Sequence, residues 1–242
     1  MIYSGGTVKL SDDAAAIIAE MEKHADPANL EGQRRYGIET SRSFGLTSVK
    51  IKELAKLSGR NHALANELRS TGYREAMHLA SLIADPGKLT DDEIDSWVRQ
   101  FNSWDVCDST CLKLFRKSPL AISKIEEWMD SEEEFIKRAG FALLAACAVH
   151  LKRENDEFFI RLLEKITEHA ADERNMIKKS VNWALRQTGK RNSALNAKAI
   201  ETCRLIQKMY PGIRGAQWIA SDALRELTGD AVQSRLTKKS LK

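Results

Sequence analysis

The chain has 242 residues, 43% of them hydrophobic, which is enough to bury the core of one large domain or two small ones. Only 4 prolines and 13 glycines interrupt it, a scarcity that argues against a β-sandwich or barrel and favours helices with short connections. The net charge of +4 indicates no partner by itself, but its distribution is uneven. Residues 174–242 carry 15 Lys and Arg against 4 Asp and Glu, and residues 1–173 carry 23 against 30, so we expect the C-terminal third to meet a polyanion.

Helical spacing of apolar residues continues almost from end to end, and no stretch alternates as a strand would. Capping signals mark several helix starts: Pro27, Thr47 or Ser48, Asn61, the capping box of Thr90 with Glu93, and Asn155 or Asp156. The predicted helices cover residues 11–24, a short stretch from 27, and then 51–57, 62–69, 73–84, 92–101, 103–117, 118–129, 132–150, 157–170, 175–189, 193–210 and 212–227.

About a dozen helices joined by short loops leave two all-α architectures, a compact bundle or a stack of antiparallel pairs. Helix pairs recur at roughly the period of HEAT-like units, so we favour an α-α superhelix, a HEAT-like repeat solenoid with a concave basic face. We expect a single helical-repeat domain over residues 1–230 and a basic C-terminal tail over residues 231–242.

The N-terminal sequence and the cysteines indicate the cellular compartment of the protein. The start, MIYSGGTVKL, lacks the apolar core of a signal peptide, and no segment is apolar enough for a membrane span. The 4 cysteines form no C-x-x-C pair and lie in apolar helical patterns, which is typical of buried free thiols in a reducing compartment. We expect a soluble cytoplasmic protein without membrane contact.

The segment FNSWDVCDSTCL contains an acid in an unusual setting. On a helix started by Ser103, Trp104 and Asp108 share a face with apolar residues. Carboxylates are rare on such a face unless a cationic group pairs with them. Asp105 lies in the first turn, where the helix dipole favours a negative charge, so we interpret it as a plain cap and keep Asp108 as the candidate functional acid.

The helix NMIKKSVNWALRQTG separates into an apolar stripe and an opposite stripe with Lys179, Trp183 and Arg186. A lone Trp in a helical protein is usually a core residue. An indole between Lys and Arg on a solvent face instead resembles a stacking platform beside phosphate-binding charges. Lys178, Lys190 and Arg191 reinforce the positive field.

Arg138 lies at the edge of the apolar stripe of the preceding long helix. It could extend its head to solvent or pair with the acids at 132–134, or its guanidinium could reach Asp108 or a backbone phosphate. The sequence leaves these alternatives open. The 5 histidines lack metal-ligand spacing, and no P-loop, dinucleotide fingerprint or nucleophile elbow is present.

Three motifs in this order, SWDVCD, EFIKRAGFALLA and IKKSVNWALRQTGKRN, resemble the DNA alkylation repair family of AlkD-like DNA glycosylases. The resemblance extends from FGLTSVKIKELAK to WIASDALREL and covers most of the chain. It implies a HEAT-like solenoid that holds duplex DNA on a concave basic surface. It also implies hydrolysis of the N-glycosidic bond of cationic N3- or N7-alkylated purines.

Carried over by motif, Trp104 and Asp108 look like the family's active-site aromatic and carboxylate. Arg138 looks like its DNA-contacting arginine, and Trp183 falls at its second active-site tryptophan. We expect further DNA contacts from six basic residues: Lys137, Lys178, Lys179, Arg186, Lys190 and Arg191.

The leading hypothesis is a monomeric, monofunctional alkylpurine DNA glycosylase that acts on duplex DNA containing alkylated bases and needs no metal or other cofactor. Two other hypotheses stay open. A non-catalytic relative would bind damaged or branched DNA with a steep salt dependence and release no base. A protein-interaction solenoid would use the basic third for an acidic partner.

Overall fold

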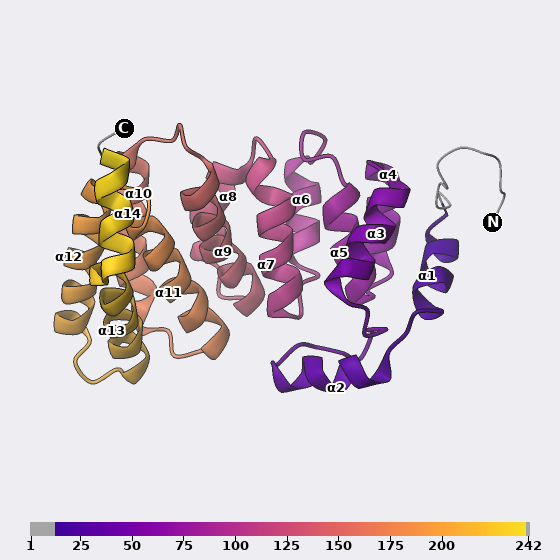
Figure 1. Cartoon of the computed structure of the whole chain (residues 1–242), viewed down its shortest axis with the longest axis horizontal. Coiled ribbons are helices and arrows are strands. Elements are labelled where there is room, and N and C mark those ends of the chain that lie inside the picture. Colours follow the sequence, from indigo (N-terminus) through magenta and orange to yellow (C-terminus); the bar gives the residue numbers. More distant parts are fainter. Residues whose placement is uncertain (1–12, 241–242) are drawn as a thin grey trace. The chain divides into compact units, whose positions relative to one another are not determined.

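The described part of the chain, residues 13–240 of the computed structural model, is built from helices and contains no strand (Figure 1). The predicted all-α class is therefore confirmed. Contacts between residues divide the chain into two compact units, Met1–Leu120 and Ala121–Lys242.

The first unit contains seven described α-helices and a 3-10 turn. They are α1 (Ala14–Glu22), α2 (Pro27–Arg35), α3 (Ser48–Ser58), α4 (His62–Ser70), α5 (Arg74–Ile83), α6 (Asp91–Val98), α7 (Trp104–Lys113) and η1 (Phe115–Lys117). Helix α5 packs against its neighbour α4, and it also contacts α3 and α7. It is therefore the central element of this unit.

The second unit contains seven further described α-helices and another 3-10 turn. They are α8 (Ala121–Met129), α9 (Glu134–His150), α10 (Asp156–Glu168), η2 (His169–Ala171), α11 (Asn175–Gly189), α12 (Ser193–Met209), α13 (Arg214–Thr228) and α14 (Asp230–Ser240). Consecutive helices pair, as in α8 with α9 and α12 with α13, and alternate helices stack, as in α9, α11 and α13 or α10 and α12. This pairing and stacking is the packing pattern of helical-repeat proteins.

Side-chain caps begin several helices where the sequence predicts them. The Thr47 hydroxyl accepts a hydrogen bond from Lys50 N at 3.3 Å, and the Asn61 amide oxygen accepts one from Leu64 N at 3.1 Å. These bonds satisfy N–H groups that a helix start leaves without partners.

The predicted capping box at α6 is only half formed. Thr90 accepts from Glu93 N at 3.2 Å, but the Glu93 carboxylate bonds to Asn66 and His62 on α4. The Glu93 side chain thus bonds to residues of α4 in place of the Thr90 backbone N–H that a capping box would use, and it links α6 to α4.

Burial differs between the two long helices α9 and α11. Helix α9 is buried on nearly every side, from Ile136 to Ala148, as expected for a helix that is apolar all round. Helix α11 buries one stripe that includes Ile177, Val181 and Leu185. The four cysteines are buried and none forms a disulfide, as predicted.

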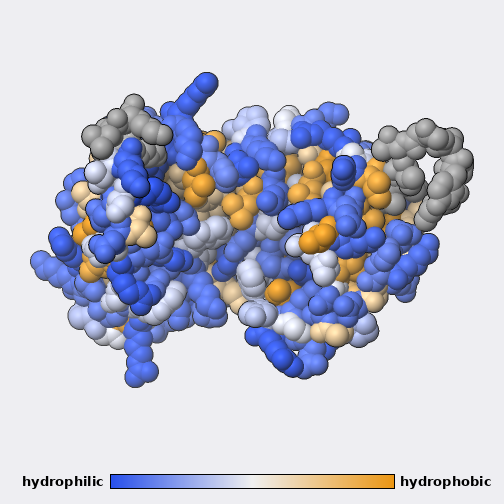
Figure 2. All heavy atoms as spheres, in the orientation of Figure 1, coloured by the Kyte–Doolittle hydropathy of each residue, from blue (hydrophilic) through white to orange (hydrophobic). Residues whose placement is uncertain are grey.

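The C-terminal segment that the sequence analysis treats as a tail begins with helix α14, which packs against α13 and α12. Val232 and Leu236 are buried there, which gives the segment a small apolar anchor. Hydrophilic side chains cover most of the visible surface over α12–α14, at the left of Figure 2. No helix among residues 13–240 is long and apolar enough to cross a membrane.

Candidate functional site

Helix α7 carries the two residues predicted to form the active site in the first unit. It begins after Ser103, and its core side consists of Val106, Cys107, Thr110 and Cys111. Trp104 and Asp108, four residues apart, are half-buried beside that core side. The prediction that Asp108 lies inside the apolar stripe is therefore wrong, because the buried side is centred on Cys107 and Cys111.

The Trp104 indole is fixed at one edge. Its Nε1 donates a hydrogen bond to the carbonyl oxygen of Tyr36, at a distance of 3.0 Å. Tyr36 ends α2 and its side chain is exposed. The contact orients the indole while the residue keeps part of its surface accessible.

Asp105, predicted to be a plain cap, is the buried acid of this helix. Its Oδ2 lies 2.7 Å from Arg74 Nε and 2.9 Å from His78 Nε2, and its Oδ1 accepts a hydrogen bond from the Ser103 hydroxyl at 2.6 Å. A carboxylate accepts only, so His78 carries a proton on Nε2. The cationic partner that the sequence predicts for an acid in this segment is thus found at Asp105.

Opposing effects set the pKa of Asp105. Burial raises the pKa, but the hydrogen bond and charge of His78, the charge of Arg74 and the Ser103 hydroxyl outweigh it. The pKa of Asp105 therefore lies well below the usual range of an aspartic acid. Asp105 is therefore ionised at neutral pH and bonded to Arg74, His78 and Ser103. Asp108 is the more accessible acid of the helix.

In the second unit, Arg138 lies on α9 and is only 5% exposed. Its Nη1 donates a hydrogen bond to the carbonyl oxygen of Met176, in the first turn of α11, at 2.6 Å. Of the alternatives left open by the sequence, a side chain extended to solvent is excluded. The guanidinium instead links α9 to the start of α11.

Trp183, on α11, is half-buried. Its indole makes no hydrogen bond, ion pair or ring contact with any residue in the described part of the chain. It is therefore neither a core tryptophan nor fully exposed.

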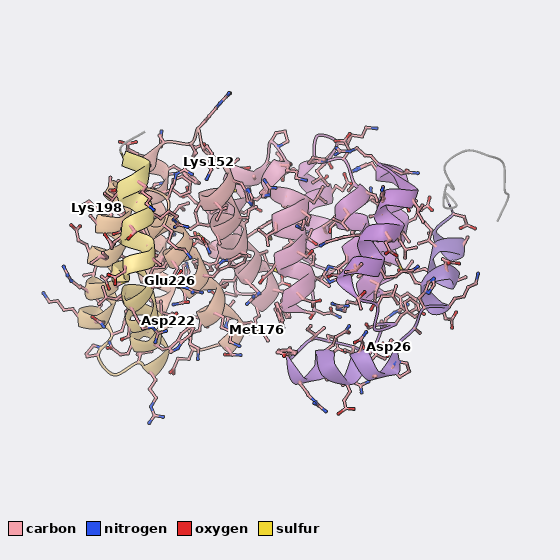
Figure 3. All side chains as sticks on the ribbon, in the orientation of Figure 1. Asp26, Lys152, Met176, Lys198, Asp222 and Glu226 are labelled. Carbon is pink, nitrogen blue, oxygen red and sulfur yellow. The ribbon has the colours of Figure 1, made fainter. Side chains whose placement is uncertain are left out.

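Two of the predicted DNA-contacting cations on α11 pair with α13. Arg186 and Lys190 both bind the Glu226 carboxylate, and Arg186 also lies 3.9 Å from Asp222. Figure 3 shows Asp222 and Glu226 on neighbouring turns of α13. Burial raises the pKa of Glu226, but its bonds to Lys190 and Arg186 have the larger effect and lower the pKa below its usual value. Glu226 therefore stays ionised and neutralises part of the predicted positive stripe.

Two other predicted DNA contacts are directed into the protein. Arg191 is 7% exposed and donates to the carbonyl oxygens of Ala148, Leu151 and Glu154, so the predicted outward-facing cation is instead a link to the end of α9. Lys137 is 4% exposed, and its Nζ lies 3.7 Å from Glu132 and 3.8 Å from Asp172. Burial of such long side chains follows from partners distant in sequence, which periodicity does not reveal.

One of the remaining two predicted cations lies near an aromatic residue that was not predicted for the site. Lys179 is exposed, and the Lys178 ammonium lies 5.4 Å from the centre of the Trp218 ring. Trp218 is itself 41% exposed on α13. An exposed indole next to a lysine is the arrangement predicted for Trp183, and only the packing of α13 beside α11 reveals it.

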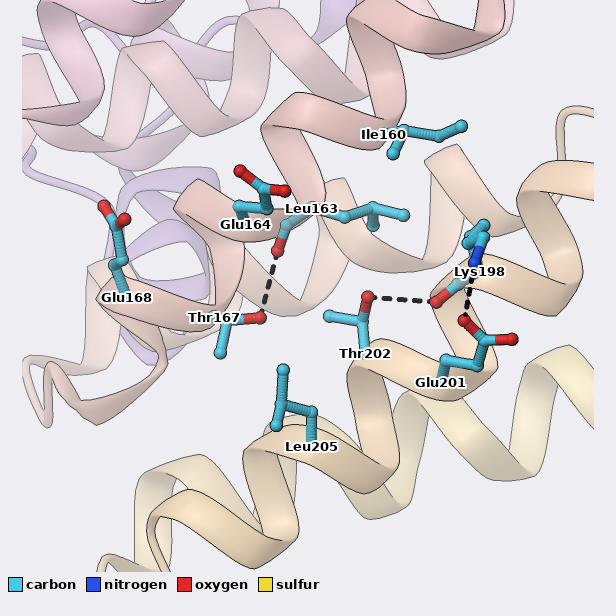
Figure 4. Close-up of a pocket in the computed structure, with 9 residues that line it drawn as sticks. All are labelled: Ile160, Leu163, Glu164, Thr167, Glu168, Lys198, Glu201, Thr202 and Leu205. Atoms are coloured by element: carbon cyan, nitrogen blue, oxygen red, sulfur yellow. Dashed lines mark hydrogen bonds and ion pairs between the residues drawn. The ribbon is translucent and has the colours of Figure 1, made fainter.

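A cavity of about 490 Å³ lies elsewhere in the second unit, between α10 and α12 (Figure 4). Its lining includes Glu164, Glu168 and Glu201, and none of the residues predicted for the functional site. Its acidic edge is unsuited to a polyanion.

Comparisons with known proteins match most of the chain. The family profile of the DNA alkylation repair enzymes matches residues 17–227. The uncharacterized protein Lin0241 of Listeria innocua is 24% identical over 211 residues, which cover 85% of this chain and 91% of that protein. The uncharacterized protein Lmo0209 of Listeria monocytogenes is 22% identical over the same shares.

A solved structure gives a TM-score of 0.70 with 22% identity and covers 79% of this chain and 82% of its own. It is described as a new family of proteins related to the HEAT-like repeat DNA glycosylases with affinity for branched DNA structures. The likeness confirms the predicted HEAT-like repeat fold.

Proposed function

Because the chain belongs to the family of DNA alkylation repair enzymes, we propose that it is a DNA glycosylase that removes cationic N3- or N7-alkylated purines from duplex DNA. The observation that carries this proposal is the pair Trp104 and Asp108, an indole and a carboxylate one turn apart on α7 and both partly accessible. The other acid of α7, Asp105, is held by Arg74 and His78 and takes no part in the chemistry.

The proposed reaction needs few protein groups. An alkylated purine already carries a positive charge, so the C1′–N bond breaks with both electrons going to the departing base and no general acid is needed. The sugar becomes oxocarbenium-like, and water adds its oxygen to C1′ and releases a proton. Asp108 stabilises the cationic sugar and orients this water.

The aromatic residues bind the cationic base. A ring face attracts a cation by roughly 0.5–2 kcal/mol, and we assign this role to Trp104 on α7. The family resemblance implies the same role for Trp183. Loss of an electrostatic group that acts on the transition state costs a factor of about 10² to 10³ in rate. We therefore expect Asp108 to contribute more to the rate than either indole.

Contacts with the DNA backbone are assigned to Lys178, Lys179, Arg186 and Lys190. The family resemblance also implies one for Arg138, which would have to exchange the Met176 carbonyl for a phosphate. Lys179 is exposed and supports this assignment most directly. Arg186 and Lys190 would exchange Glu226 for phosphates on binding.

The test is chromatographic identification of the bases released from methylated duplex DNA, with unmodified duplex as the blank. We expect 3-methyladenine and 7-methylguanine from the wild-type protein and from Asp92→Asn, which removes an exposed carboxylate of α6. With Asp108→Asn we expect the rate of base release to fall by a factor of about 10² or more. Release that is undiminished in both Asp108→Asn and Trp104→Ala would refute the assigned site.

A second candidate is a protein that binds branched DNA without excising a base. The related structure described as having affinity for branched DNA favours it. Preferential binding of a four-way junction over linear duplex, without base release from methylated DNA, would establish this function in place of the first.

A further inference from the structure

A small cavity of about 80 Å³ lies within the first unit, between α3, α5 and α7. Its polar lining consists of Ser48, Lys52, Arg74, His78, Ser109 and Lys113, and no carboxylate lines it. The volume exceeds the share of one water, about 30 Å³, and is too small for a nucleobase and its sugar. It suits a small oxyanion.

Each of the three helices contributes two polar residues at the same spacing. Ser48 and Lys52 lie four residues apart on α3, as do Arg74 and His78 on α5. Ser109 and Lys113 repeat the spacing on α7. Residues four apart share a helix face, so each pair is directed to one place by regular helical geometry.

The cations of this lining fall into two classes. Arg74 and His78 are held by Asp105, and Arg74 Nη1 also lies 3.3 Å from Glu75, whose carboxylate accepts three backbone N–H groups of the loop before α3. Lys52 and Lys113 are exposed and form no ion pair or hydrogen bond with any residue between 13 and 240. The two lysines are therefore the charges that internal carboxylates leave uncompensated.

The surroundings of the lysines supply hydrogen-bond donors. The hydroxyls of Ser48 and Ser109 line the same cavity. Ser48 is also the first residue of the 11-residue helix α3, so the cavity lies near the positive end of that helix dipole. Two ammonium groups, two hydroxyls and a helix start together match a group with several anionic oxygens.

We propose that the cavity between α3, α5 and α7 binds a phosphate group, with Lys52 and Lys113 as its charge partners and Ser48 and Ser109 as hydroxyl donors. The source of that phosphate rests on the proposed function: it belongs to the backbone of bound DNA. The acidic N-terminal part of the chain would then contain a local cationic contact for DNA in addition to the basic C-terminal third.

The first arm of the test measures the affinity for unmodified duplex at several salt concentrations. Lys52→Ala/Lys113→Ala is compared with Lys56→Ala/Lys88→Ala, which removes two exposed lysines that do not line the cavity. Each neutralised phosphate contributes about 0.9 to the slope of log affinity against log salt. We expect the cavity variant to lose affinity and about one unit of slope relative to the control variant. Equal affinities and slopes would overturn the DNA backbone as the source.

The second arm replaces DNA with inorganic phosphate, titrated against chloride at constant ionic strength while the unfolding midpoint is recorded. We expect phosphate to raise the midpoint of the wild-type and control proteins more than that of the cavity variant. A response in this arm alone supports the site with free phosphate as its ligand. If neither arm separates the two variants, the phosphate site is refuted. If the wild type binds no DNA, the proposed function fails, and the phosphate arm alone decides the cavity.

Discussion

Two acids on α7, three residues apart, have opposite surroundings. Asp105 is buried between Arg74, His78 and Ser103, whereas Asp108 is half-buried one turn after Trp104. The structural role and the proposed chemical role of this segment are thus carried by different carboxylates. Substitutions at the two positions should be separable in their effects on stability and on activity.

Asp105→Asn should lower the free energy of unfolding by about 3 kcal/mol near pH 7, because it removes the carboxylate that the half-buried Arg74 and His78 share. The folded-state pKa of Asp105 is lowered, so its contribution is present above the unfolded-state pKa of about 3.9 and is lost as pH falls through the folded-state value. Urea denaturation between pH 7 and pH 3 measures the difference in unfolding free energy between variant and wild type. This difference should become smaller below about pH 4, and a difference that stays constant would contradict this role.

The sequence predicts the positions of Trp104 and Asp108 but not the role of Asp105. Helical spacing placed Trp104 and Asp108 on neighbouring turns, which the structure confirms. It could not reveal the function of Asp105, because its partners lie on α5, about 30 residues away, and no local pattern links them. Whether Trp104 and Asp108 act on DNA stays a prediction.

At the scale of helices, caps and apolar stripes predicted most elements, and the predicted bounds of α11 agree with the structure at both ends. Side-chain caps set the starts of helices such as α3 and α4, so local sequence was sufficient there. The burial of Arg191 and the pairing of Glu93 with α4 depend on tertiary contacts and were not predicted. Helix α14 was expected only as a tail, since its apolar content is small.

The contact between α8 and α9 depends on a glycine. A Cβ on Gly140 would lie 2.6 Å from Met129 N and 3.0 Å from Ile125 O, and both are backbone atoms that cannot turn away. Gly140→Ala should therefore lower the free energy of unfolding by about 1–3 kcal/mol through overpacking. Gly32→Ala is the matched control, because nothing lies within 4 Å of a Cβ there and alanine favours the helix. Thermal or chemical denaturation that ranks the two variants equally would contradict the close approach.

The ion pairs between α11 and α13 give a prediction about DNA affinity. Glu226→Gln should free Arg186 and Lys190, so DNA binding should become tighter at low salt and its salt dependence steeper. Glu201→Gln is the control, since it removes a carboxylate that pairs with Lys198 instead. Fluorescence anisotropy with labelled duplex measures both. If Glu226→Gln binds DNA no more tightly than the control, Arg186 and Lys190 are not DNA contacts.

At the scale of the whole molecule, the uneven charge of the sequence gains a more specific meaning. The positive C-terminal third compensates several of its own cations internally, and the acidic remainder contains two lysines at a cavity without carboxylates. Net charge per segment is thus a poor guide to where an anion binds, since pairing decides which charges remain available. The HEAT-like fold was predicted from helix length, loop length and the motif resemblance together.

The central claim is that Asp108 supports cleavage of the N-glycosidic bond in alkylated DNA. The most direct measurement is the single-turnover rate of base release from a duplex with one N7-methylguanine, at protein concentrations that saturate the DNA. We expect release by the wild type and by Asp92→Asn, and a rate lower by a factor of about 10² to 10³ in Asp108→Asn with unchanged DNA affinity. Saturated binding without release by the wild type, or an equal rate in Asp108→Asn, would contradict it.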